Sequence, residues 1–180
     1  QRHDGSLLFE IFGKQGCIVS CLTGRTLDEL NLNQLRSSGQ ALAQLHLAGS
    51  DFATQRDNPT GSAWLKEHVD AVLAETKTRY GDEAGELLSR ELNFQSSCAW
   101  ESLPTGVIHG DLFVDNILFE GDNVSGVIDF YYAHSAAFVM DIAISLNAQA
   151  VLLSDADDER IQAFMDGYQS LRPLNEDEVE

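Results

Sequence analysis

Basic residues are scarce in this chain, and long apolar runs are missing. Its 180 residues include 11 lysines and arginines against 29 aspartates and glutamates, so the formal net charge is −18. Nucleic acids and anionic membranes bind to basic surface that neutralises their phosphates, so the charge argues against both partners. No stretch is apolar over the length of a membrane span, and Gln1 does not open a signal peptide. We therefore expect a cytoplasmic protein.

Cysteine is also scarce. The three cysteines, Cys17, Cys21 and Cys98, are an odd and scattered set that does not describe a disulfide framework. Cys17 and Cys21 fall at an even spacing in a strand-like pattern, which predicts small buried hydrophobic side chains. A zinc site at His109 is disfavoured, because no second histidine or cysteine follows at ligand spacing.

Hydrophobic periodicity predicts strands at the start of the chain and helices over most of the rest. The expected strands are 6–12 and 17–22, separated by a turn at 13–16. The expected helices are 33–48, 82–94 and 138–153, together with one that is capped by Ser62 and ends at Gly81 and one that runs from Ser154 to near Gly167. Residues 130–136 are expected to form a loop. His46 lies on the apolar face of its helix, where a core histidine is more common than a catalytic one. Asn175 and Glu178 predict a helix start with reciprocal capping.

The stretch 107–130 carries the residues expected to do chemistry. It reads as strand, polar loop, strand, turn and strand, at 107–108, 109–116, 117–119, 120–123 and 124–128. Turn residues between two apolar runs predict a tight hairpin. This hairpin should bring Asp129 close to Asp111 and Asn116, at the mouth of one small sheet.

This set of side chains suits phosphoryl transfer. A catalytic loop of the protein-kinase type has His-x-Asp, four further residues, Asn, and then a hairpin that ends in Asp-Phe. His109, Asp111, Asn116 and the pair Asp129-Phe130 have that order and spacing. Asp111 would be the catalytic base, and Asn116 and Asp129 would be magnesium ligands. The alternative is an ordinary hairpin with acidic residues at its mouth.

Longer motifs resemble a known superfamily. His109-Gly-Asp-Leu-Phe-Val-Asp-Asn116 and Gly126-Val-Ile-Asp-Phe-Tyr131 resemble the aminoglycoside and choline phosphotransferases, and among them most closely the homoserine kinases. Met140-Asp-Ile-Ala143 resembles the family's aspartate that opens a helix and steadies the catalytic loop. Upstream, Cys17-Ile-Val-Ser-Cys-Leu-Thr-Gly-Arg25 resembles its hinge strand, and Ala43-Gln-Leu-His-Leu-Ala-Gly49 its next helix.

The resemblance implies an α+β, protein-kinase-like fold. It divides the chain into the remnant of an N-terminal β lobe and hinge at 1–24 and a mostly helical C-terminal lobe at 25–180, which contains the catalytic hairpin. The implied cofactors are ATP and Mg²⁺. The hinge backbone at Ser20, Cys21 and Leu22 would bind adenine. His109 and Asp141 would support the catalytic loop, with Asp141 as the partner of His109.

The implied reaction is ATP-dependent phosphorylation of a small primary alcohol, most closely L-homoserine to O-phospho-L-homoserine in threonine synthesis. A choline- or aminoglycoside-type acceptor is the alternative within this class, and Asp115, Asp155 and Asp157 could equally meet a cationic sugar. The family's Gly-rich loop and phosphate-binding lysine have no equivalent in the chain. We therefore expect a fragment that is inactive by itself, and a non-catalytic remnant is the alternative of a different class.

Overall fold

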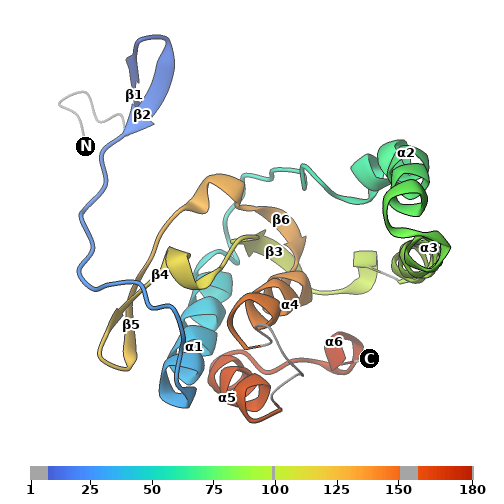
Figure 1. Cartoon of the computed structure of the whole chain (residues 1–180). Coiled ribbons are helices and arrows are strands. Elements are labelled where there is room, and N and C mark those ends of the chain that lie inside the picture. Colours follow the sequence, from blue (N-terminus) through green and yellow to red (C-terminus); the bar gives the residue numbers. More distant parts are fainter. Residues whose placement is uncertain (1–7, 99, 151–157, 180) are drawn as a thin grey trace.

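The structure, a computed structural model, describes residues 8–98, 100–150 and 158–179. It mixes helices with three antiparallel two-stranded sheets, which pair β1 with β2, β3 with β6, and β4 with β5 (Figure 1). The elements are β1 (Leu8–Ile11), β2 (Lys14–Cys17), α1 (Leu32–Ala48), α2 (Ser62–Tyr80), α3 (Asp82–Ser97), η1 (Trp100–Ser102), β3 (Thr105–Ile108), η2 (Val114–Asn116), β4 (Ile117–Glu120), β5 (Asn123–Val127), η3 (Phe130–Tyr132), β6 (His134–Ala137), α4 (Phe138–Gln149), α5 (Asp158–Gln169) and α6 (Glu176–Val179).

Helix α1 is the centre of the packing. Its start is set by a capping box, in which Asn31 accepts a hydrogen bond from the Gln34 amide and the Gln34 side chain accepts one from the Asn31 amide. One face of α1 packs closely against α5. Gly39 and Gly167 make this crossing possible, because a Cβ atom at either position would overlap the backbone of the facing helix. The close approach holds α5 against α1.

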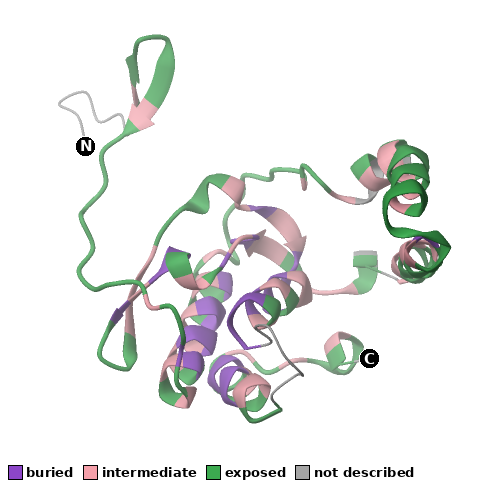
Figure 2. Cartoon of the chain, in the orientation of Figure 1, coloured by how far each residue is buried: buried purple, intermediate pink, exposed green. Residues whose placement is uncertain are grey.

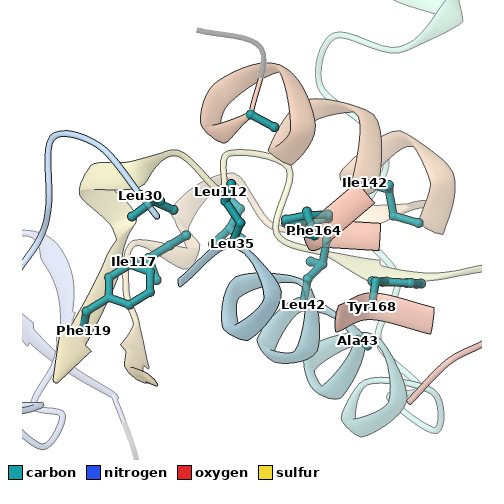
Figure 3. Close-up of a cluster of buried hydrophobic side chains, with 12 residues drawn as sticks. Leu30, Leu35, Leu42, Ala43, Leu112, Ile117, Phe119, Ile142, Phe164 and Tyr168 are labelled. Atoms are coloured by element: carbon teal, nitrogen blue, oxygen red, sulfur yellow. The ribbon is translucent and has the colours of Figure 1, made fainter. Parts of the chain in front are cut away.

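The hydrophobic core joins α1, α4 and α5 to the segment that carries the predicted site (Figure 3). It includes Leu30, Leu35, Leu42, Ala43, Leu112, Ile117, Phe119, Ile142, Phe164 and Tyr168, all buried. Burial of each large apolar side chain stabilises the fold by roughly 1.5–3 kcal/mol. Leu112 and Ile117 flank the loop residues 113–116, so the loop is anchored in the core at both ends.

The N-terminal hairpin differs from the prediction. Residues 14–17 form β2 and not a turn, and the chain reverses at Phe12 and Gly13, whose φ values are 52° and 72°. The predicted strand at 17–22 is wrong beyond Cys17, because 18–24 has no strand partner along most of its length. β1 and β2 stand apart from the helices and are largely exposed (Figures 1 and 2). A domain boundary after residue 24 stays a prediction.

Exposure of this hairpin also overturns the prediction for two cysteines. Cys17 and Cys21 are both exposed, whereas buried hydrophobic positions were expected. The period-two spacing indicated a buried strand face, but no element covers that face in the part of the chain that the structure describes.

The predicted helices form, with altered ends. Gly61 is the N-cap of α2 and Ser62 is its first helical residue, so the predicted cap at Ser62 is wrong. α3 runs to Ser97, beyond the expected end at 94. The end expected for α4, at 151–153, lies outside the described residues, as do Ser154, Asp155 and Asp157. Asn175 and Glu178 cap α6 reciprocally, as predicted. Among the described residues, no helix has the length and apolar character to cross a membrane.

The catalytic segment forms two sheets. β4 and β5 make the predicted hairpin, with Ile117 opposite Val127. β3 pairs with β6, so that Ile108 lies opposite His134. The prediction of one sheet, and of a loop through 130–136, is therefore wrong. β6 is made of His, Ser and Ala, which have little intrinsic strand preference, and it is a strand because β3 supplies its partner.

Candidate active site

The candidate site is the loop between β3 and β4, closed by the end of β5. Gly110 has a φ of 74°, a left-handed conformation that glycine adopts without strain. A Cβ atom at Gly110 would also lie 2.9 Å from the His134 ring and 3.1 Å from the Tyr132 ring. The turn after His109 therefore needs glycine for both its conformation and its space, and it aims the next residue, Asp111, away from the core.

His109 is fully buried and fixed in the loop. Its Nε2 lies 2.9 Å from the Ile128 carbonyl oxygen, and its Nδ1 accepts a hydrogen bond of 3.3 Å from the Asp111 amide. This pattern suits the neutral tautomer with the proton on Nε2, which donates to the carbonyl. The ring also packs on Phe130, with centroids 4.8 Å apart. Both ring nitrogens are used inside the protein, so the side chain acts as a brace between the loop and the hairpin.

Asp141 holds the backbone of the same loop. It lies in the first turn of α4, is completely buried, and accepts hydrogen bonds from the amides of His109 at 2.7 Å and Gly110 at 2.9 Å. The prediction paired Asp141 with His109, and the contact is made to the His109 backbone while the imidazole bonds to Ile128. A carboxylate that accepts two amide bonds holds the loop backbone in one conformation.

The side chain that completes this anchor is His46. Its Nε2 lies 3.0 Å from Asp141 Oδ2, and its Nδ1 lies 2.7 Å from the Tyr168 hydroxyl oxygen. His46 is thus a satisfied core histidine, as predicted, but its partners tie α1 and α5 to the catalytic loop. Burial raises the pKa of Tyr168 to about 12, so the hydroxyl stays protonated across the physiological range. Sequence spacing could not have indicated this contact, because the two residues joined to His46 lie far along the chain.

Asp111 and Asn116 face each other across the loop. The Asn116 side-chain amide nitrogen donates to the Asp111 carbonyl oxygen at 2.8 Å and lies 3.5 Å from Asp111 Oδ2. The Asp111 side chain is half-buried, whereas Asn116 is buried, with 9% of its surface exposed. The bond from the amide nitrogen fixes the orientation of Asn116 and leaves its oxygen for another partner.

The hairpin brings Asp129 to this loop. The amide of Ile128, the residue before it, donates to the Asn116 carbonyl oxygen at 3.0 Å. Asp129 itself is exposed and has a φ of 66°, a conformation that is uncommon for a residue with a side chain. Such left-handed residues concentrate at functional sites, where surrounding contacts hold them in place. The structure therefore places Asp111 and Asn116 in contact, and it bonds the residue before Asp129 to the backbone of Asn116.

The predicted hinge runs along the same hairpin. Arg25 forms an isolated bridge with Phe119, and the Ser125 hydroxyl donates to the Thr23 carbonyl oxygen at 2.7 Å. Leu22 packs against Gly126, three residues before Asp129. Ser20, Cys21 and Leu22 are exposed and non-helical. Their proposed contact with adenine stays a prediction.

A comparison with protein families identifies the family of this chain. The model of the phosphotransferase enzyme family matches residues 1–175. The chain belongs to this family. Its α+β architecture is accordingly that of the aminoglycoside phosphotransferases, as predicted from the motifs.

Two curated relatives of this chain are homoserine kinases. That of Methylobacillus flagellatus is 39% identical over 175 residues, which cover 97% of this chain and 54% of the relative. That of Neisseria meningitidis serogroup B is 38% identical over 178 residues, which cover 98% of this chain and 57% of the relative. The chain spans about half the length of the curated relatives it matches.

A solved structure agrees on the fold. The amicoumacin kinase in complex with AMP-PNP, Ca²⁺ and Ami superposes with a TM-score of 0.68 at 15% identity, over 96% of this chain and 55% of that one. That kinase was solved with a nucleotide analogue and a divalent metal. At 15% identity, its likeness to this chain shows the shared fold alone.

The oxygen donors at this site suit magnesium. Across 8–98, 100–150 and 158–179, no group of three or more His, Cys, Asp and Glu side chains could hold a metal ion. A kinase site does not need such a group, because Mg²⁺ keeps several waters and uses one or two protein ligands with phosphate oxygens. The free oxygen of Asn116 and the exposed carboxylate of Asp129 fit that requirement.

Proposed function

We propose that the protein is an ATP-dependent phosphotransferase that acts on a small primary alcohol, with L-homoserine as the acceptor and O-phospho-L-homoserine as the product. The observation that carries the proposal is the contact of Asp111 with Asn116 beside a fixed His109, with Asp129 one residue beyond the backbone bond from Ile128 to Asn116. The homoserine kinases at 38–39% identity support the choice of acceptor. The reaction would belong to threonine synthesis.

Each residue of the candidate site has a distinct role in this proposal. The Asp111 carboxylate orients the acceptor hydroxyl and takes its proton as the hydroxyl oxygen bonds to the γ-phosphorus of ATP, the bond from that phosphorus to the bridging oxygen breaks, and ADP leaves. Asn116 and Asp129 would hold Mg²⁺, which would neutralise charge on the phosphates of ATP, the phosphoryl donor. Asp141 and His109 keep the loop rigid, since phosphoryl transfer depends mainly on positioning and charge. The hinge backbone at Ser20, Cys21 and Leu22 binds adenine.

Two further expectations accompany the proposal. The chain by itself should have no appreciable kinase activity, because it contains no equivalent of the family's Gly-rich loop and phosphate-binding lysine. The expected partner is a small molecule in the cytoplasm, with no nucleic acid or membrane involved. The strongly acidic composition supports that choice of partner.

An acceptor panel tests the function. The full-length protein that carries this chain would be incubated with ATP and Mg²⁺, and with L-homoserine, choline or an aminoglycoside in separate reactions. ADP release and mass spectrometry of the acceptor would report phosphorylation. We expect L-homoserine to give the highest kcat/KM. A higher value for choline or an aminoglycoside would favour the alternative acceptors, and no transfer to any acceptor would favour a non-catalytic remnant.

A further inference from the structure

Arg56 lies on the polar segment between α1 and α2 and is bound to the loop that follows Asp129. One of its terminal guanidinium nitrogens, NH1, donates to the Tyr131 carbonyl oxygen at 2.6 Å and to the Ala133 carbonyl oxygen at 3.1 Å. The Arg56 backbone also bonds in both directions with Ser135. The side chain and backbone of Arg56 are thus both bound to this loop, although Arg56 as a whole is exposed.

These bonds orient the guanidinium group and leave part of it free. NH1 has two N–H groups, and the two carbonyl oxygens account for both. No described residue accepts a hydrogen bond from Nε or from the other terminal nitrogen, and no described carboxylate forms an ion pair with Arg56. The free edge of the fork has the geometry that binds a carboxylate through two parallel hydrogen bonds.

The loop to which Arg56 is bound lies next to the base. Tyr132, between the two carbonyl groups that Arg56 contacts, packs its ring against Gly110, and Gly110 precedes Asp111. The Tyr132 hydroxyl contacts the Thr60 hydroxyl, so a second residue of the 50–61 segment is attached to the same loop. Arg56 is therefore bound to the segment 131–135, and that segment packs against the loop that carries Asp111.

We propose that Arg56 determines specificity by binding the α-carboxylate of an amino-acid acceptor while Asp111 meets its hydroxyl. The inference rests on the proposed function. A chain with a net charge of −18 repels a carboxylate, so the carboxylate of an amino-acid acceptor needs a local cation. Arg56 supplies that cation with its fork already held in place, which reduces the entropy lost when the acceptor binds.

The test compares three acceptors in the full-length protein. L-homoserine has both an amine and a carboxylate, 4-hydroxybutyrate lacks the amine, and 3-aminopropan-1-ol lacks the carboxylate. Arg56→Gln should raise KM about 10- to 100-fold for the two acids, which lose a charge-assisted pair of hydrogen bonds, and leave KM for 3-aminopropan-1-ol unchanged. Arg56→Lys should be intermediate for the acids, because lysine keeps the charge without the fork.

Arg79→Gln is the matched control, since it removes the same charge from an exposed arginine that pairs with Glu75 on α2. It should leave all three KM values unchanged. An equal effect of Arg56→Gln on the three acceptors would overturn the proposal and leave Arg56 as a brace for the loop. If the wild-type protein phosphorylates neither acid but accepts an uncharged or cationic alcohol, the proposed function itself fails, and the inference fails with it.

Discussion

Removal of the Asp141 carboxylate should destabilise the fold more than any single exposed ion pair does. Asp141 is completely buried and accepts hydrogen bonds from two amides and from His46. Each buried donor that loses its acceptor costs about 1–3 kcal/mol, and breaking a buried pair on one side costs about 3–5 kcal/mol in total. We therefore expect Asp141→Ala to lower the free energy of unfolding by about 3–5 kcal/mol.

Asp141→Asn is a milder version of the same change. It keeps one acceptor oxygen but turns an amide NH₂ toward a donor, so the expected loss is about 2 kcal/mol. Urea unfolding of the 180-residue chain, followed by circular dichroism, would give both values without an activity assay. The control is Asp166→Ala, which breaks an exposed ion pair with Arg36 and should cost less than about 1 kcal/mol. Losses below 1 kcal/mol for both Asp141 variants would refute the view that this residue anchors the loop.

Three further results are expected. Gly167→Ala forces a Cβ atom into the α1 backbone and should lower the free energy of unfolding in urea by more than about 2 kcal/mol. Gly85→Ala meets only the flexible Lys77 side chain and should lower it by less. Equal losses for the two variants would contradict the close crossing of α1 and α5. Burial raises the pKa of Tyr168 to about 12. The stability that the protonated Tyr168 hydroxyl contributes to the folded state is therefore complete below about pH 10 and is lost toward pH 12. The free energy of unfolding should therefore fall between pH 9 and pH 11 by about 1.4 kcal/mol more than in Tyr168→Phe, and parallel pH profiles would contradict this. Mg²⁺ should raise the thermal midpoint of the wild-type chain modestly and that of Asp129→Ala less, and an identical shift would remove Asp129 from the metal site.

The loop and hairpin of the candidate site could be predicted from sequence because their signal is local. The spacing from His109 to Asn116 and the hairpin before Asp129 depend on neighbouring residues and on turn chemistry. The pairing of β3 with β6 could not be predicted in this way, because the strand at 134–137 depends on partners 26 to 32 residues earlier in the chain and not on its own composition.

Contacts between distant segments were also beyond prediction. His46 was expected to be a satisfied core residue, but its bond to Asp141 joins positions that only the packing of α1 against α4 and α5 brings together. Arg56 lies in a polar connection without periodicity, so its contacts with the carbonyl groups of 131 and 133 left no pattern in the sequence. Cys17 and Cys21 show the opposite error. Their spacing is typical of a buried strand face, but both side chains are exposed because no described element covers them.

The most direct test of the central claim is the transfer of the γ-phosphate of ATP to L-homoserine by the full-length protein. Radiolabelled ATP, Mg²⁺ and L-homoserine would be incubated with the wild type, with Asp111→Asn, and with Asp122→Asn as a control. Asp122 lies in the turn of the hairpin, where it accepts hydrogen bonds from Asn31 and Asn33. We expect labelled O-phosphohomoserine from the wild type and the control, and a loss of about 10²-fold or more in Asp111→Asn. Undiminished product from Asp111→Asn, or none from the wild type, would contradict the account.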